Sequence, residues 1–255
     1  MQTIWVIGAS SGIGLAVAKA YAKQDFNVIV SARRQDVLED ICADQPNMHA
    51  VALDMAKLSS IQNALKQVET VASHIDKVII NAGTAEYIDD LPMDVDLMRR
   101  VFEINFFGVI NMINASLPFL YEAVRKGVKP QLAIVASSVT YQALPRAHAY
   151  GASKAAIRYV TESLKTDIQH HGVDVRIISP GFVKTPLTDK NDFDMPFLID
   201  SEEAAKRIVK GLKGSHFDIH FPKRFTLILK LFSWLPHGIK FWMLGKMSRF
   251  EKVDK

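Results

Sequence analysis

Short apolar runs alternate with longer amphipathic segments from the N-terminus to about residue 215. The apolar runs have the length of buried strands, and the segments between them carry hydrophobic residues at helical spacing. This alternation predicts an α/β fold, a doubly wound parallel sheet (Rossmann fold) with helices on both faces. The expected strands are 3–7, 27–31, 48–53, 78–81, 132–137 and 173–179.

A glycine-rich loop, GASSGIG at residues 8–14, joins the first expected strand to the first expected helix. Strand, glycine turn and helix in this order are typical of a dinucleotide-binding unit, because the helix N-terminus offers free N–H groups to a pyrophosphate. The spacing differs from the familiar G-x-G-x-x-G, and a plain strand-to-helix turn is the alternative. The cofactor-binding candidates here are Gly8, Ser10, Ser11, Gly12, Ile13 and Gly14.

Two arginines, Arg33 and Arg34, follow the second expected strand. An NAD-binding unit commonly carries a carboxylate here for the ribose 2′-hydroxyl, whereas an arginine accommodates a 2′-phosphate. Since no Asp or Glu occurs from residue 27 to residue 35, the sequence predicts NADP (NADPH) rather than NAD. The alternative is that both arginines are solvated loop charges.

Tyr150 and Lys154 lie four residues apart, and such positions share a face of a helix. Two unit charges ~4 Å apart at an effective dielectric of ~20 interact by about 4 kcal/mol. That energy corresponds to roughly three pKa units. We therefore expect the Lys154 ammonium to lower the pKa of Tyr150 and to make it a general acid or base near neutral pH.

These motifs resemble those of the short-chain dehydrogenase/reductase family over about residues 3–215. The glycine loop and the Tyr150–Lys154 pair match that family in order and position. Further matching positions are Asp54, Asn81, Ala82, Gly83, Asn105, Ser138, Pro180, Gly181, Val183 and Thr185. The resemblance implies that Asp54 lies near the adenine and that the loop from Pro180 to Thr185 meets the nicotinamide carboxamide.

The resemblance also implies an oxidoreductase that transfers hydride between NADP(H) and a carbonyl or secondary alcohol. Tyr150 would protonate the developing alkoxide, and Ser138 would hydrogen-bond the same oxygen. Lys154 would also bind the nicotinamide ribose, and Asn105 would help hold a water that returns the proton.

The identity of the catalytic serine is open between two neighbours, Ser137 and Ser138. Family members usually place it thirteen positions before the tyrosine, a count that Ser137 meets. Alignment of the preceding strand favours Ser138, with a one-residue deletion in the loop 139–149.

Two other function classes are alternatives for a chain with this glycine loop. A non-catalytic dinucleotide sensor or scaffold can keep a glycine loop while losing catalytic groups, which are all present here. Sugar-nucleotide epimerases or dehydratases of this fold typically carry a larger C-terminal substrate domain, for which the chain has no room. No Cys/His cluster indicates a metal site. The segment 186–200 is expected to cover the substrate pocket with Phe193, Met195, Phe197 and Leu198.

The 255 residues, 49% apolar and 23% charged, suit one globular catalytic domain, expected at 1–215. The first strand begins at residue 3, so we expect no cleavable signal and a cytoplasmic location. The long helices around Asn105 and Tyr150 resemble those that pair subunits in the family, which suggests a homodimer or homotetramer.

The segment 216–255 differs in composition and is expected to form an amphipathic extension. It carries eight Lys or Arg and three Asp or Glu, a balance of +5, whereas the whole chain is at +4. In one interpretation, this segment packs on the domain or on a partner subunit. In the other, it makes a peripheral contact with a membrane, which would suit a lipophilic substrate. Its apolar stretches are too short to span a membrane. Nucleic acid is not expected, because residues 1–215 are not basic.

Overall fold

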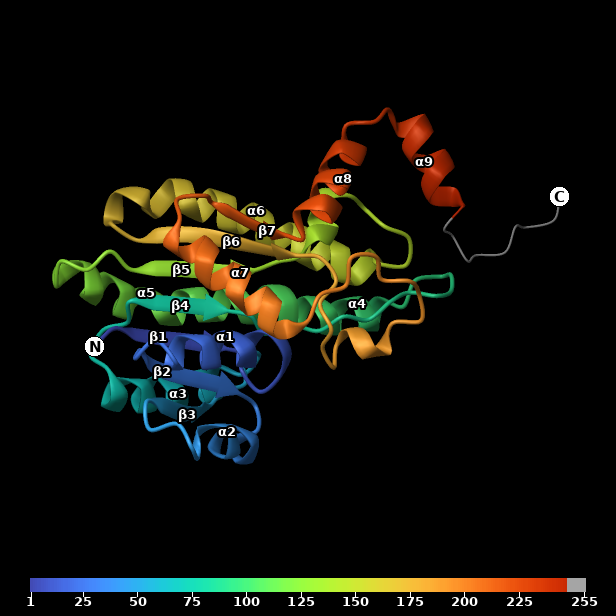
Figure 1. Ribbon diagram of the computed structural model, residues 1–255. Helices are drawn as coiled ribbons and strands as arrows, with labels where there is room; N and C mark the ends of the chain where they lie inside the picture. The colour runs from blue at the N-terminus through green and yellow to red at the C-terminus, as the bar shows by residue number, and fades with distance from the viewer. Residues whose placement is uncertain (247–255) are drawn as a thin grey trace.

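Within residues 1–246, which this computed structural model describes, seven parallel strands form one sheet in the order β3-β2-β1-β4-β5-β6-β7 (Figure 1). The order reverses direction between β1 and β4, the arrangement that opens a ligand crevice at the carboxyl ends of the strands. The strands are β1 (Thr3–Ile7), β2 (Asn27–Ala32), β3 (Met48–Ala52), β4 (Lys77–Ile80), β5 (Gln131–Val135), β6 (Asp174–Pro180) and β7 (Asp218–Phe221).

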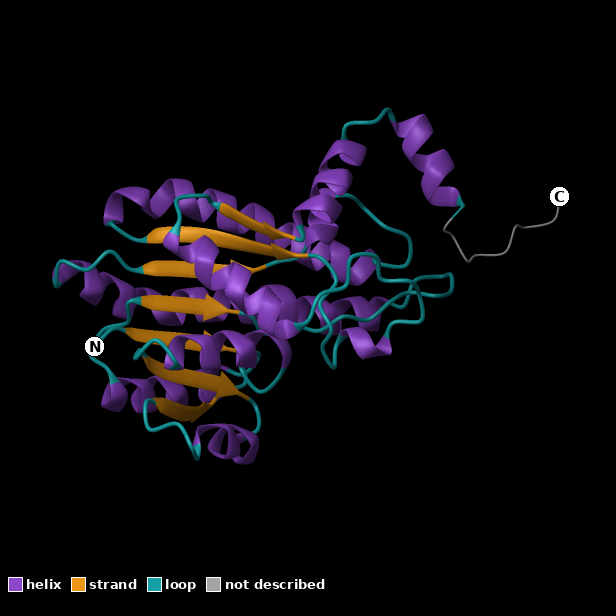
Figure 2. Cartoon of the chain, viewed as in Figure 1, coloured by secondary structure: helices purple, strands orange, loops and turns teal. Residues whose placement is uncertain are grey.

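Helices cover both faces of the sheet (Figure 2). One face packs against α1 (Gly12–Ala22), α2 (Gln35–Cys42) and α7 (Ser201–Lys213). The other packs against α3 (Leu58–Val71), α5 (Val109–Arg125) and α6 (His148–Ile168). The remaining helical segments are α4 (Val95–Phe102), η1 (Glu103–Gly108), η2 (Ser138–Tyr141), η3 (Gln169–His171), η4 (Thr188–Lys190), α8 (Lys223–Ser233) and α9 (His237–Gly245).

Strand β1 shows why the expected strands are almost wholly apolar. Its side chains alternate between two cores, with Trp5 and Ile7 in one and Ile4 and Val6 in the other. A parallel strand covered on both faces buries every side chain, so its sequence reads as a continuous hydrophobic run. The expected doubly wound fold is confirmed, and the six expected strands lie in the sheet with ends shifted by at most two residues.

The seventh strand, β7, was not expected, and it lies within the segment 216–255 that we assigned to an extension. It pairs with β6 from Asp218 to Phe221, so the sheet continues past residue 215. Its signal is a brief alternation, because Ile219 and Phe221 are buried while Asp218 and His220 are partly exposed. A strand of four residues with two polar members is easily read as loop. The part of the chain that follows the sheet is the helix pair α8 and α9.

Among the described residues, one continuous helical stretch, Val95–Arg125, has the length and hydropathy of a membrane span. It is 44% buried inside the domain, as the core helix of a globular fold would be. Residues 247–255, the last part of the expected extension, lie outside the described residues.

Candidate active site

Tyr150 and Lys154 lie one turn apart on α6, as the sequence predicts. Lys154 is only 4% exposed, and its Nζ donates to the carbonyl oxygen of Val135 at the end of β5, at 3.0 Å. A β-carbon built on Gly83 would stand 3.2 Å from that Nζ. The glycine after β4 therefore leaves room for the lysine head, and Tyr150 lines the adjacent cavity.

The electrostatics of this pair differ from the expectation. Burial raises the pKa of Tyr150, and a hydrogen bond with the Ser137 side chain opposes the rise. Burial also lowers the pKa of Lys154, to about 8. The expected lowering of the Tyr150 pKa by Lys154 is not found, because leaving water disfavours the charged form of both groups.

The serine pair lies where β5 passes into η2, and both serines line the cavity. The Ser137 hydroxyl accepts from the backbone N–H of Val139 at 3.2 Å and contacts the Tyr150 side chain through a hydrogen bond. Ser138 is buried beside it. The contact with Tyr150 favours Ser137, which the sequence alignment made the second choice.

Asn105 is fully buried in η1, a π-helical turn between α4 and α5. Its amide makes a reciprocal pair with Thr84, since Thr84 N donates to Oδ1 at 2.8 Å and Nδ2 donates to Thr84 O at 2.8 Å. Nδ2 also donates to Ser153 Oγ on α6 at 3.1 Å. The side chain therefore ties the loop after β4 to the helix that carries Tyr150. Turns of this kind often occur at functional sites.

The glycine loop forms a cradle at the N-terminus of α1. Gly8 and Gly12 have positive φ angles of 82° and 53°. A β-carbon at Gly8 would lie 2.6 Å from Ala82 Cα, and one at Gly14 would lie 2.1 Å from Gly8 O, so neither position admits a side chain. The hydroxyl of the N-cap residue Ser11 makes no capping bond, which leaves the helix N-terminus available to an anion. This cradle fits the pyrophosphate of a dinucleotide.

Further cofactor candidates surround the loop. Asn81 donates from Nδ2 to Gly8 O at 3.1 Å, which joins the end of β4 to the cradle. Thr185 lies against the loop from the other side, because a β-carbon on Gly12 would stand 2.9 Å from its methyl group. In the loop after β6, Gly181 N donates to Phe221 O at 2.7 Å and Val183 is buried. These contacts bring the ends of β1, β4 and β6 together.

Two candidates lie farther along the sheet edge. Arg33 and Arg34 follow β2 and are exposed. Asp54 follows β3, and its Oδ1 accepts from Ala56 N at 3.1 Å within its own turn. The structure thus gathers the sequence-predicted residues along one edge of the sheet.

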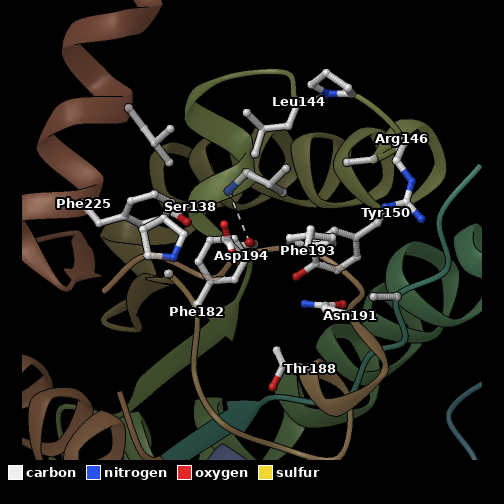
Figure 3. A pocket seen from close by; sticks show the side chains of 18 of the residues that line it. Ser138, Leu144, Arg146, Tyr150, Phe182, Thr188, Asn191, Phe193, Asp194 and Phe225 are labelled. Atoms are coloured by element: carbon white, nitrogen blue, oxygen red, sulfur yellow. Dashed lines mark hydrogen bonds between the residues drawn. The ribbon is translucent and has the colours of Figure 1, made fainter. Parts of the chain in front are cut away.

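A cavity of about 510 Å³ opens from Tyr150 toward the C-terminal helices (Figure 3). Its wall is largely apolar and aromatic, with a few polar groups near its rim. The apolar and aromatic lining residues include Leu144, Tyr150, Phe182, Leu187, Phe193, Phe225, Ile228, Leu229, Phe232, Met243 and Leu244. Such a lining suits a lipophilic molecule.

The segment 186–200 only partly fulfils its expected role as an apolar cover. Phe193 lines the cavity and packs edge-on against Tyr87 and Phe182. Met195, Phe197 and Leu198 are not among the described lining residues, and Phe197 and Leu198 are exposed. The backbone at Phe197 has a φ of 59°, a left-handed conformation that redirects the chain after Phe193.

Arg146 links three loops around the cavity, and local sequence patterns did not reveal it. Its guanidinium forms ion pairs with Asp89, from the loop after β4, and with Asp192, from the loop after β6, the latter at 2.7 Å. The guanidinium carbon, Cζ, lies 5.5 Å from the ring centre of Tyr87 and 6.0 Å from that of Phe193. The partners are more than forty positions away in sequence, so no short-range spacing could have indicated this contact.

Comparison with known proteins agrees with this fold. The family model described as short chain dehydrogenase matches residues 2–195. A Myxococcus xanthus (strain DK1622) protein described as an uncharacterized oxidoreductase is 30% identical over 242 residues, which cover 93% of this chain and 94% of the relative.

Solved structures show the same fold. A short chain dehydrogenase from Burkholderia cenocepacia J2315, in complex with NADP, has a TM-score of 0.82 at 24% identity and covers 96% of this chain and 99% of its own. One from Burkholderia phymatum, in complex with NAD, has a TM-score of 0.81 at 17% identity, covering 90% and 92%. The parallel sheet, its glycine cradle and the family match define an oxidoreductase with a dinucleotide-binding fold. The chain belongs to the short-chain dehydrogenase/reductase family.

Proposed function

We propose that this protein uses NADP(H) to interconvert a lipophilic carbonyl compound and its secondary alcohol, with Tyr150 as the general acid–base. The observation that carries the proposal is the position of Tyr150 in the wall of an apolar cavity, with Ser137 at its hydroxyl and Lys154 one turn farther on the same helix. A tyrosine so placed can exchange a proton with a substrate oxygen.

The cofactor would be held by the cradle of Gly8, Gly12 and Gly14, with Thr185 beside it. When bound, NADPH supplies the hydride. The exposed Arg33 and Arg34 support a 2′-phosphate at the ribose, and the carboxylate typical of NAD-binding units is missing from residues 27–35 of the sequence. The solved relative that carries NADP supports the same choice, whereas another relative carries NAD.

The proton chemistry is assigned to this chain's own side chains. Because burial raises the pKa of Tyr150, the phenol is held protonated at neutral pH and can donate its proton as negative charge grows on the substrate oxygen. The Ser137 hydroxyl fixes the direction of the phenol and is placed to hydrogen-bond the same oxygen. The Nζ of Lys154 donates to Val135 O and lies close to Gly83, in the loop after β4.

The apolar lining has a second role besides binding. Phe182, Phe193 and Phe225 surround the space in front of Tyr150, and they keep water away from the reacting carbonyl. The same lining favours bulky ketones and aldehydes over small polar ones. A homodimeric or homotetrameric assembly and a cytoplasmic location stay predictions.

The decisive variant is Tyr150→Phe, with Tyr159→Phe as its matched control on the exposed side of the same helix. A panel of lipophilic ketones and aldehydes is screened for oxidation of NADPH and of NADH. We expect Tyr150→Phe to lose turnover while NADPH binding by fluorescence is retained, and Tyr159→Phe to keep both. Turnover by Tyr150→Phe near the wild-type rate would refute the assignment.

The two serines are separated by a second pair of variants, Ser137→Ala and Ser138→Ala. The contact with Tyr150 predicts the larger loss of kcat for Ser137→Ala, on the order of the 10²–10³-fold seen when one donor to a developing oxyanion is removed. A larger loss for Ser138→Ala would return the role to Ser138.

A further inference from the structure

Helices α8 and α9 expose large apolar side chains, and two of these, Ile228 and Met243, also line the cavity. Trp234 is 86% exposed and Trp242 is 65% exposed, values far above those of the core. The exposed apolar residues of this surface, which we call the α8–α9 surface, are Leu227, Ile228, Leu231, Trp234, Ile239, Phe241, Trp242 and Met243. Large apolar side chains exposed in such number on two successive helices mark an interaction site.

The spacing of these residues shows that α8 has two different sides. Phe225 and Leu229 are buried against the domain. Leu227, Leu231 and Trp234 follow one another at intervals of four and three positions, so they lie on one exposed stripe. The helix is therefore docked by one side and leaves the other unpartnered, while α9 has no buried residue.

A charged network fixes α8 in that position. Asp218 on β7 accepts from Tyr141 at 2.7 Å, from Ser179 at 2.9 Å and from Arg158 at 3.3 Å. Lys230 of α8 donates to the same carboxylate at 3.3 Å. The exposed stripe is thus presented by a helix that is anchored to the sheet.

The charge of this region is of one sign. Residues 223–246 contain Lys223, Arg224, Lys230, Lys240 and Lys246 and no Asp or Glu. Lys223, Arg224 and Lys246 are exposed beside the apolar residues. Tryptophan and lysine next to exposed leucine are the composition of a helix that lies in a membrane interface and attracts anionic headgroups.

The surface also borders the candidate active site. Ile228 and Phe232 from α8 and Met243 and Leu244 from α9 line the same cavity as Tyr150. Figure 1 shows both helices projecting beyond the carboxyl edge of the sheet, away from the helices that cover its faces. A flat surface that met α8 and α9 would therefore lie next to the cavity.

We propose that the α8–α9 surface docks on an anionic lipid bilayer, apolar side chains inserted and lysines at the headgroups. A second copy of this chain is a poorer occupant, because a two-fold contact would bring two acid-free basic helix pairs together. Entry of a lipophilic substrate into the cavity from the bilayer would rest on the proposed function. Docking on the bilayer does not depend on that function.

Docking is measured on the full chain by flotation with vesicles of phosphatidylcholine plus phosphatidylserine, and with vesicles of phosphatidylcholine alone. We expect binding to the anionic vesicles that weakens as salt is raised. Trp5 is buried in the core, so quenching of tryptophan fluorescence by brominated lipid reports Trp234 and Trp242. Truncation near Gly214 is unsuitable, because it removes β7 from the sheet.

Point variants identify the surface. The double variant Trp234→Ser/Trp242→Ser should lose about 30-fold or more in vesicle affinity, as burial of each indole contributes at least ~1 kcal/mol. Arg224→Glu should lose roughly fivefold or more, since each cation near an anionic surface contributes about 1 kcal/mol. Tyr159→Ser on α6 and Lys66→Glu on α3 are the exposed controls and should bind as wild type.

Three results would overturn the proposal: equal binding to both vesicle types, no quenching by brominated lipid, or unchanged affinity of the double tryptophan variant. Light scattering without lipid tests the other occupant. An oligomer that the double variant alone disrupts would assign the surface to a second copy. None of these readouts uses turnover, so failure of docking and failure of the proposed catalysis are distinguishable.

Discussion

Replacement of Arg146 by methionine tests whether one buried cation holds the substrate segment 186–200 against the cavity. Methionine keeps an unbranched apolar stem but removes the ion pairs with Asp89 and Asp192 and the contacts with the Tyr87 and Phe193 rings. Both carboxylates are more than half exposed, at 58% and 56%, so water replaces much of what each loses.

The magnitude follows from that exposure. Ion pairs between exposed groups contribute ~0.2–1 kcal/mol each, whereas the Arg146 side chain is only 10% exposed, which places its pairs toward the upper end. The ring contacts add about 0.5–1 kcal/mol each. The four contacts together amount to about 3 kcal/mol, and because the partners are loops we expect the loss to appear as local opening. Amide hydrogen exchange in 186–200 should then accelerate about 100-fold or more.

The assay is hydrogen exchange by mass spectrometry, which needs no substrate. Arg99→Met is the matched control, because the Arg99 pair with Asp96 is a fully surface contact on α4. That variant should change exchange nowhere by more than about twofold, since surface substitutions usually stay within ±0.5 kcal/mol. Exchange of 186–200 in Arg146→Met within about twofold of wild type would refute the reasoning, and so would acceleration spread evenly over the core.

Three further changes have defined outcomes. Arg33→Asp should raise KM for NADPH by about tenfold or more and leave KM for NADH little changed, because a carboxylate repels the 2′-phosphate; steady-state kinetics with both cofactors measures this. Lys154 has a folded pKa of about 8, below its ordinary 10.5, so the unfolded chain binds more protons between these values. The free energy of unfolding of wild type, relative to that of Lys154→Met, should therefore rise by up to about 1.4 kcal/mol per pH unit between pH 8 and pH 10. Urea unfolding measures this difference, and a difference that does not change with pH would contradict the burial of Lys154. Asp218→Asn leaves Arg158 and Lys230 without their shared carboxylate and should lower the free energy of unfolding by about 3 kcal/mol, whereas a loss below ~1 kcal/mol would show that the network does not anchor α8.

The sequence alone determined the parts of this protein that depend on short-range patterns. The strand runs, the glycine loop and the four-residue spacing of Tyr150 and Lys154 each follow from local periodicity, and the sheet and α6 contain them as expected. The order of strands then brings the loops after β1, β4, β5 and β6 to one edge, since parallel strands end on the same side. The general location of the site could therefore be predicted.

Only the tertiary structure decided which side chains meet and how burial changes their chemistry. The Ser137 side chain, which caps η2, is within hydrogen-bond reach of the Tyr150 side chain. Burial raises the pKa of Tyr150 more than its hydrogen bond with Ser137 lowers it. Arg146 joins loops that are distant in sequence. Desolvation and long-range pairing depend on what other segments place around a group, and no local pattern of residues contains that information.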